Sequence, residues 1–264
     1  MASSDQTLKS MQIAQPRRVL VIPARRRSTR LPDKLMLRVG GRTVLEHTYD
    51  VARRVERAEL CLIATDDEEI AAEARSFGAA AVMTSVDCPS GADRVAEAVR
   101  RIPSAEIIVN LQGDEPDASP ADVDRVFQLL EDDPQAGMAT LCTPIRTRAM
   151  LEDPACVKVV CDEGGRALYF SRSPIPHPRE WDESLLVSEP PAFLQHLGIY
   201  AYRRALLEKM TSLPPSRLEQ IERLEQLRVL ECGETIRIAQ VAAASRGIDT
   251  PADFEAFAAR RRAG

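Results

Sequence analysis

The chain has 264 residues, of which 44% are hydrophobic and 28% charged, and its formal net charge is −5. The isoelectric point of about 5.4 and the mean hydropathy of −0.22 are ordinary for a soluble globular protein, and the acidic balance argues against general nucleic-acid binding. No apolar run approaches the length of a membrane span, and the first 18 residues lack the apolar middle of a secretory signal.

The first half of the chain alternates between strand-like and helix-like segments. The apolar, β-branched segments predict strands at 18–24, 60–66, 79–84 and 106–116. Helical spacing and capping residues predict helices at 43–55, 67–78, 91–102 and 119–132. Four such pairs imply an α/β fold with a mainly parallel central sheet and helices on both faces. Ligands of such sheets bind beyond the carboxyl ends of the strands.

The second half changes character. Strand-like segments separated by Gly or Pro turns occur at 155–162, 166–172 and 196–204, and helices are predicted at 216–233 and 250–262. No linker divides the chain sharply, so we expect a disordered leader at residues 1–17 and a single domain at 18–264. The six cysteines form no Cys-x-x-Cys pair, which favours free thiols in a reducing cytoplasm.

A dense basic loop, "IPARRRSTRLPDK", follows the first strand at Ile22–Lys34. One interpretation is a set of surface arginines that keeps the loop soluble. The other is a cradle for a triphosphate, in which backbone N–H groups at a strand-to-helix turn act with Arg25, Ser28, Arg30 and Lys34. Because the loop has neither a Walker pattern nor Gly-x-Gly-x-x-Gly, its side chains must supply most of the positive charge.

Two carboxylates are candidate magnesium ligands. Asp114 in "LQGDEP" comes at the tip of a predicted central strand, where it can hold Mg²⁺ against phosphates or serve only as a turn residue. Asp249 in "GIDTP" is the candidate second ligand. It is equally placed to cap the helix that begins at Thr250, and both roles can hold together.

For the candidate residues in the second half, the neighbouring sequence gives weaker support for a functional role. His196 alone is typical of a hydrogen-bonded strand histidine. Arg172 closes a strand, where a guanidinium can bind a carboxylate or lie on the rim. The helical pattern places Glu225 and Gln226 toward solvent.

Taken together, the segments resemble one family. "VLVIPARRRSTRLPDK", "SGADR", "IIVNLQGDEP", "ALYFSRSPIP", "HLGIYAYRR", "LEQLR" and "IDTPADFE" occur in the order found in the CMP-Kdo synthetases, the 3-deoxy-manno-octulosonate cytidylyltransferases. The resemblance covers about residues 18–262, and "HLGIY" with "LEQLR" is its most specific part. It implies a nucleotidyltransferase fold with a nucleotide-binding half at 18–145, a smaller mixed sugar-binding and dimerisation half at 146–264, and a homodimer.

The resemblance also implies roles for individual residues. CTP would be bound by Arg25, Ser28, Arg30, Lys34, Ser90, Arg94 and Gln112. Mg²⁺ would be held by Asp114 and Asp249, which with Lys34 form the catalytic set. The acidic sugar would be bound by Arg172, His196, Tyr200, Glu225 and Gln226.

The implied reaction transfers CMP from CTP to the anomeric hydroxyl of 3-deoxy-D-manno-octulosonate, releases pyrophosphate and activates the sugar for lipopolysaccharide synthesis. Two alternatives stay open from the residues. The acceptor could be a related acidic sugar, such as an 8-amino relative or a nonulosonate, or the chain could be a non-catalytic nucleotide-binding relative.

The basic loop departs from the family pattern at three positions. Asp33 replaces a glycine, Leu35 replaces a proline, and Arg26 stands where an aromatic residue is frequent. An acidic Asp33 weakens the positive field of the loop, and a residue other than glycine restricts the backbone there.

Overall fold

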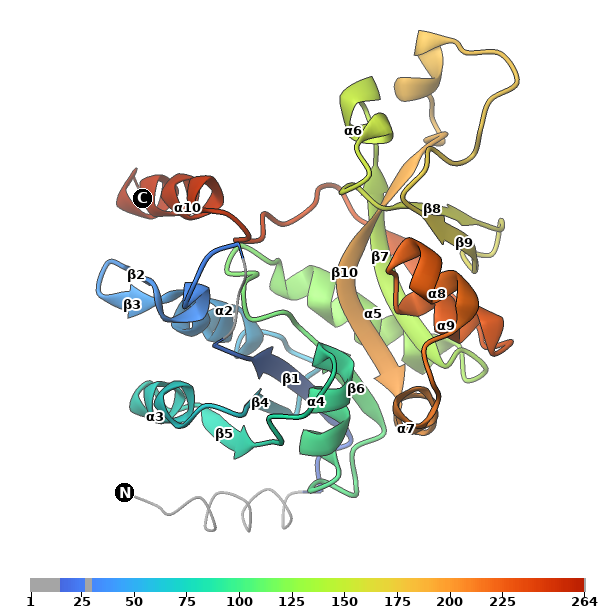
Figure 1. Cartoon of the computed structure of the whole chain (residues 1–264). Helices are drawn as coiled ribbons and strands as arrows, with labels where there is room; N and C mark the ends of the chain where they lie inside the picture. Colours follow the sequence, from blue (N-terminus) through green and yellow to red (C-terminus); the bar gives the residue numbers. More distant parts are fainter. Residues whose placement is uncertain (1–14, 27–29, 264) are drawn as a thin grey trace. The chain divides into compact units, whose positions relative to one another are not determined.

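The computed structural model describes residues 15–26 and 30–263 (Figure 1). The chain divides into two compact units, one formed by Met1–Asp124 with Ser245–Gly264 and the other by Arg125–Ala244. The second unit is therefore an insertion in the sequence of the first. The predicted leader falls mostly outside the described residues, although Pro16 and Arg17 accept hydrogen bonds from Ser104, Glu106 and Ile107. The division into a nucleotide-binding half at 18–145 and a sugar-binding and dimerisation half at 146–264 stays a prediction.

A parallel sheet with the order β6-β1-β4-β5 forms the centre of the first unit. Its strands are β1 (Arg18–Ala24), β4 (Leu60–Thr65), β5 (Ala80–Met83) and β6 (Ile107–Asn110). β1 is buried along most of its length because it is covered on both faces, as its unbroken apolar sequence predicts. The predicted parallel sheet and α/β class are confirmed.

A helix follows each of these strands along the chain, and a further helix ends the described chain; each begins within one residue of its predicted start. They are α2 (Val44–Ala52), α3 (Glu68–Ser76), α4 (Gly91–Val99), α5 (Pro120–Asp132) and α10 (Pro251–Ala263). Side chains of Thr43, Asp67 and Ser90 accept hydrogen bonds from the first turns of α2, α3 and α4. After β5 the chain reverses its direction across the sheet, so right-handed crossovers put α4 on the face opposite α2 and α3.

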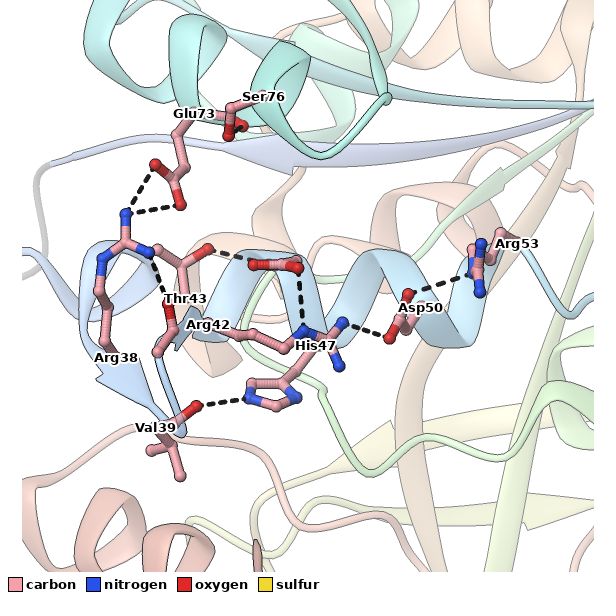
Figure 2. Close-up of polar contacts among 11 residues, drawn as sticks. Arg38, Val39, Arg42, Thr43, His47, Asp50, Arg53, Glu73 and Ser76 are labelled. Carbon is pink, nitrogen blue, oxygen red and sulfur yellow. Dashed lines mark hydrogen bonds and ion pairs between the residues drawn. The ribbon is translucent and has the colours of Figure 1, made fainter.

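The segment between β1 and α2 is a short 3₁₀ helix, η1 (Lys34–Met36), followed by a two-stranded hairpin. The hairpin pairs β2 (Arg38–Val39) with β3 (Arg42–Thr43), and Gly40 and Gly41 turn it with positive φ angles. Figure 2 shows the polar contacts that fix it: Arg38 binds Glu73 of α3 with two hydrogen bonds of 2.8 Å. The hairpin is thus held to α3 by charge.

The second unit has a mixed sheet. β7 (Met138–Pro144) pairs in parallel with β11 (Ile236–Gln240) and antiparallel with β10 (Leu194–Arg203). β8 (Lys158–Cys161) pairs antiparallel with β10 and with β9 (Ala167–Ser171), as the Gly164-Gly165 turn predicts. The shorter helices are α6 (Arg148–Glu152), η2 (Glu183–Leu186) and α7 (Arg204–Ser212).

The predicted helix at 216–233 is wrong. The segment forms two six-residue helices, α8 (Arg217–Glu222) and α9 (Gln226–Glu231). Arg223 ends α8 in the left-handed conformation, with φ 55° and ψ 47°, and a helix cannot continue through that geometry. The regular spacing of leucine and isoleucine did not reveal this break, although Ile221 of α8 is 66% exposed whereas Leu227 of α9 is fully buried.

None of the helices in the described part of the chain is long and apolar enough to cross a membrane.

Candidate active site

A cavity of about 660 Å³ opens where the strands of the first unit end. β1 leads into Arg25, η1 carries Lys34, α4 begins at Gly91, and the turn after β6 carries Asp114. The predicted residues that line the cavity are Arg25, Arg30, Lys34, Ser90, Arg94, Gln112, Asp114 and Asp249. Ser28 lies outside the described residues. The structure therefore brings together every described member of the predicted nucleotide and metal sets.

The Lys34 ammonium lies between the two candidate metal ligands. Its Nζ donates to Asp114 and, at 3.1 Å, to Oδ1 of Asp249. Burial lowers the pKa of Lys34, but the charge of Asp114 and hydrogen bonds to both aspartates outweigh burial and leave that pKa above its ordinary value. Arg30 lies 3.1 Å from the other oxygen of Asp249. The two carboxylates thus converge on one position that already attracts a cation.

A second segment brings Asp249 to Asp114. The Ile248 amide donates to the Asp114 carbonyl at 2.8 Å, and the Ser245 hydroxyl donates to Glu115 at 2.6 Å. A Cβ on Gly247 would lie 2.9 Å from a Glu115 oxygen, so glycine permits this close approach.

Asp249 does not cap α10. Thr250 does so, because its hydroxyl accepts from the Asp253 amide at 3.2 Å while Asp253 accepts from the Thr250 amide at 2.8 Å. The carboxylate of Asp249 is therefore left for Lys34 and Arg30.

The walls of the cavity are polar but well ordered. Arg94 is 4% exposed and pairs with Asp66 at 3.2 Å. The Ser90 hydroxyl caps α4 and also donates to Asp93 at 2.7 Å, so the amino-terminal end of α4 faces the cavity with its partial positive charge. Among residues 15–26 and 30–263, no carboxylate pairs with Arg25, whose guanidinium is available to an anion.

Glu115 was missed by the sequence analysis. Burial raises its pKa to about 7, a hydrogen bond from Ser245 opposes this, and the charges of Asp114 and Asp249 add to the rise. The sequence showed an acidic pair in a turn, and nothing in it indicated that Glu115 is half-buried beside Ser245.

The candidate sugar-binding residues all belong to the second unit, where His196 is enclosed. It is 8% exposed on β10, and burial lowers its pKa to about 3. Its Nε2 lies 3.1 Å from the Thr140 hydroxyl, which lies 2.9 Å from the carbonyls of Leu197 and Ile199. Since that hydroxyl proton goes to a carbonyl, Nε2 of His196 donates and its Nδ1 carries the lone pair.

Tyr200 and Glu225 lie near His196. The Tyr200 ring centroid is 5.4 Å from that of His196, and burial together with the charge of Glu225 raises the pKa of Tyr200. The expectation that Gln226 faces solvent is wrong: it is 3% exposed, because the break at Arg223 turns α9. Its Nε2 has no hydrogen-bond partner among the described residues.

Arg172 has a definite structural task. Its guanidinium donates to the carbonyls of Glu222 at 2.7 Å, Pro154 at 2.9 Å and Arg223 at 3.4 Å. It closes the end of α8 and has two of its five N–H groups left. Lys158, which the apolar "VKVV" concealed, is fully buried, and its ammonium donates to the Asp153 carbonyl at 2.9 Å.

Comparison with known proteins agrees with this arrangement. The family model described as cytidylyltransferase matches residues 19–236. A 3-deoxy-manno-octulosonate cytidylyltransferase from Rhodopirellula baltica is 49% identical over 243 residues, which cover 92% of this chain and 97% of that protein. The chain belongs to the 3-deoxy-manno-octulosonate cytidylyltransferase family.

Other members of the family support the assignment. The Escherichia coli protein of the same name is 44% identical over 90% of this chain and 93% of its own. A solved structure of CMP:2-keto-3-deoxy-manno-octonic acid synthetase complexed with CTP has a TM-score of 0.87 and 43% identity, covering 94% of this chain and 99% of that one. The 4-diphosphocytidyl-2C-methyl-D-erythritol synthase of Anaerococcus prevotii, at 14% identity and a TM-score of 0.59, shares the fold alone.

Proposed function

We propose that this protein transfers CMP from CTP to the anomeric hydroxyl of 3-deoxy-D-manno-octulosonate and releases pyrophosphate. The observation that carries the proposal is the cavity at the strand ends, where Lys34 lies between Asp114 and Asp249 in a chain of this family. The product would be the activated sugar that lipopolysaccharide synthesis consumes.

The cavity supplies what the triphosphate requires. CTP carries about four negative charges, and Arg25, Arg30 and Lys34 place three cations in one wall. The amino-terminal end of α4, with Ser90 and Arg94, would face the cytidine, and Gln112 would lie beside the nucleotide. The chemistry is an in-line displacement at the α-phosphorus, so positioning and charge neutralisation contribute most of the rate.

Magnesium is the proposed cofactor. Within residues 15–26 and 30–263, no three His, Cys, Asp or Glu side chains gather as a metal site. A pair of carboxylates is nevertheless what Mg²⁺ commonly uses when substrate phosphates and waters complete its shell, and Asp114 and Asp249 already share one cation. When bound there, the ion would lower the negative charge at the α-phosphate and favour an attacking alkoxide.

The second unit would bind the acidic sugar. Arg172 keeps two N–H groups for a carboxylate, and Lys158 adds a buried positive charge. A neutral His196 offers a lone pair to a sugar hydroxyl at pH 7, because its pKa of about 3 keeps it uncharged. The unpartnered Gln226 amide would find its hydrogen bond on the ligand, with Tyr200 and Glu225 beside it.

We also propose a homodimer in the cytoplasm. Leu168 and Ile221 of the second unit are 59% and 66% exposed, and apolar side chains of this kind are often covered by a partner. All six cysteines are free thiols, which suits a reducing compartment. Light scattering that shows only a 29.2 kDa species at working concentration would contradict the dimer.

The reaction is tested by measuring pyrophosphate release from each of the four nucleoside triphosphates, with and without 3-deoxy-D-manno-octulosonate. We expect release with CTP and the sugar together, and loss of release when EDTA removes divalent ions. Release that is equally fast without the sugar, or with any nucleotide, would refute the assignment.

A further inference from the structure

Two residues of the basic loop form an ion pair that the predicted site does not include. Nε of Arg26 donates to Oδ1 of Asp33 at 2.9 Å, and its Nη1 donates to Glu69 of α3 at 2.6 Å. Arg26 stands at the start of the loop and Asp33 at its end, directly before Lys34. The Arg26 guanidinium therefore links Asp33 to Glu69 of α3.

Asp33 is the unfavourable member of this pair. It has φ 52° and ψ 26°, the left-handed conformation, which side chains other than those of Asn and Asp rarely adopt. Its carboxylate also brings a negative charge next to the residues that would neutralise a triphosphate. Both Arg26 and Asp33 line a second cavity of about 580 Å³ whose wall shares Arg25 and Arg94 with the nucleotide cavity.

Two glutamates of α3 bind arginines that lie before and after η1 in the chain. Glu69 binds Arg26, which precedes η1. Glu73, one turn further along α3, binds Arg38, which follows η1, and Figure 2 shows this second pair. The backbone between these arginines carries Lys34, which begins η1. Two arginine–glutamate pairs on one helix thus fix the position from which Lys34 reaches the cavity.

We propose that Arg26 is a positioning residue for nucleotide binding, which cancels the charge of Asp33 and holds that carboxylate away from the phosphates. The inference rests on the proposed CTP site. Removing the guanidinium of Arg26 leaves Asp33 as an unpaired anion beside Arg25 and Lys34. The negative charge of Asp33 then repels the phosphates of CTP and weakens binding. The effect is electrostatic, so it should weaken as salt concentration rises.

A double-mutant cycle of Arg26→Ala and Asp33→Asn tests this. Asparagine removes the charge and tolerates the left-handed conformation. For Arg26→Ala we expect the Kd and KM for CTP to rise about three- to tenfold, with kcat changed less than twofold. Asp33→Asn alone should bind CTP at least as tightly as the wild type. In the double variant, the Kd for CTP should rise less than about twofold above the wild-type value, because no negative charge remains at position 33.

Arg53→Ala is the matched control, since Arg53 makes an exposed pair with Asp50 on α2 and lines neither cavity. It should leave the Kd for CTP unchanged. An unchanged Kd in Arg26→Ala would overturn the proposal, as would an equal loss with and without Asp33→Asn, which would assign the effect to the bond with Glu69. A wild type that binds no CTP by calorimetry would refute the proposed function and the inference with it, whereas binding with an additive cycle refutes the inference alone.

Discussion

The two units build their candidate binding surfaces from different chemistry. In the first unit the side chains follow the ends of parallel strands and are charged, with opposite charges in contact around Lys34. In the second unit the buried side chains of His196 on β10 and Gln226 at the start of α9 are uncharged. Charge there comes from single groups such as the Arg172 guanidinium, which is held by backbone carbonyls. A site for phosphates needs charge that is fixed in place, whereas a site for a polyhydroxylated sugar needs neutral donors and acceptors at set positions.

The largest effect is expected at the charged site. Asp114→Asn and Asp249→Asn should each lower kcat on the order of a hundredfold to ten-thousandfold, because a neutral amide is a poorer magnesium ligand than a carboxylate. CTP binding should fall less, since Arg25, Arg30 and Lys34 still face the phosphates. Magnesium-dependent pyrophosphate release beside calorimetric CTP titration measures both quantities.

Asp87→Asn serves as the control for this pair, because Asp87 is an exposed acid of the same unit that lines neither cavity. Near wild-type turnover in either asparagine variant would show that its aspartate is only a turn residue or a partner of Lys34.

A substitution at the uncharged, buried Gln226 of the second unit should change stability as well as kinetics. Gln226→Met removes a buried amide nitrogen that has no partner among the described residues, so the free energy of unfolding should rise by about 1 kcal/mol. The same change should raise KM for the sugar about tenfold or more and leave KM for CTP unchanged, because a lost ligand hydrogen bond is costly. Urea denaturation and steady-state kinetics check the two parts.

Gln220→Met on α8 is the matched control, since Gln220 is exposed and bonds only the Pro215 carbonyl. If Gln226→Met lowers stability and leaves the sugar KM unchanged, Gln226 is a structural residue and belongs outside the site.

Protonation of His196 should make the stability of the second unit depend on pH. The folded pKa of His196 is about 3, below the ordinary value of 6.5, so acid favours the unfolded chain. Its contribution to stability is complete above pH 6.5 and is lost as pH falls toward 3. Between pH 7.5 and pH 5.0 we expect this residue to account for about 2 kcal/mol of lost stability.

The variant His196→Gln lacks this titration, so its stability should fall less over the same interval, as measured by urea denaturation. His47, whose pKa burial also lowers, is present in both proteins and cancels in the difference. Parallel pH profiles for the two proteins would mean that His196 is hydrated and readily protonated.

The smallest effect concerns the break that turns Gln226 inward. Arg223→Gly should raise the free energy of unfolding by about 0.5–1 kcal/mol, because glycine adopts a φ of 55° without strain. In a continuous helix the same change would instead cost about 1 kcal/mol. Arg223→Ala, which keeps the Cβ, is the control. A rise in the free energy of unfolding for Arg223→Gly supports the left-handed break at Arg223, and a fall supports a continuous helix.

The difference between the units also explains what the sequence could predict. In the first unit Ser90 caps α4 as expected. Lys34, Asp114 and Asp249 converge, because polar residues after buried strands must meet at one edge of a parallel sheet. The partial burial of Glu115 was unforeseen there, because burial of one carboxyl in a turn depends on residues as distant as Ser245.

The second unit offered less local information. β7 and β11 were not predicted as strands, and their seven and five residues, respectively, form a sheet by pairing with each other and with β10. The left-handed Arg223 is stabilised by long-range contacts, including the bond from Arg172 to its carbonyl, and no local pattern of charge or hydrophobicity encodes it. The expected roles of Tyr200 and Glu225 therefore came from family resemblance alone.

The insertion of the second unit between two parts of the first has a consequence for how the protein is made on the ribosome. Asp114 is synthesised before the inserted unit and Asp249 after it. A nascent chain can pair β1, β4, β5 and β6 long before the segment that begins at Ser245 emerges. Until then Lys34 has one carboxylate partner instead of two. A polypeptide that terminates anywhere in residues 125–244 therefore lacks half of the carboxylate pair, and its translation yields no partly competent enzyme.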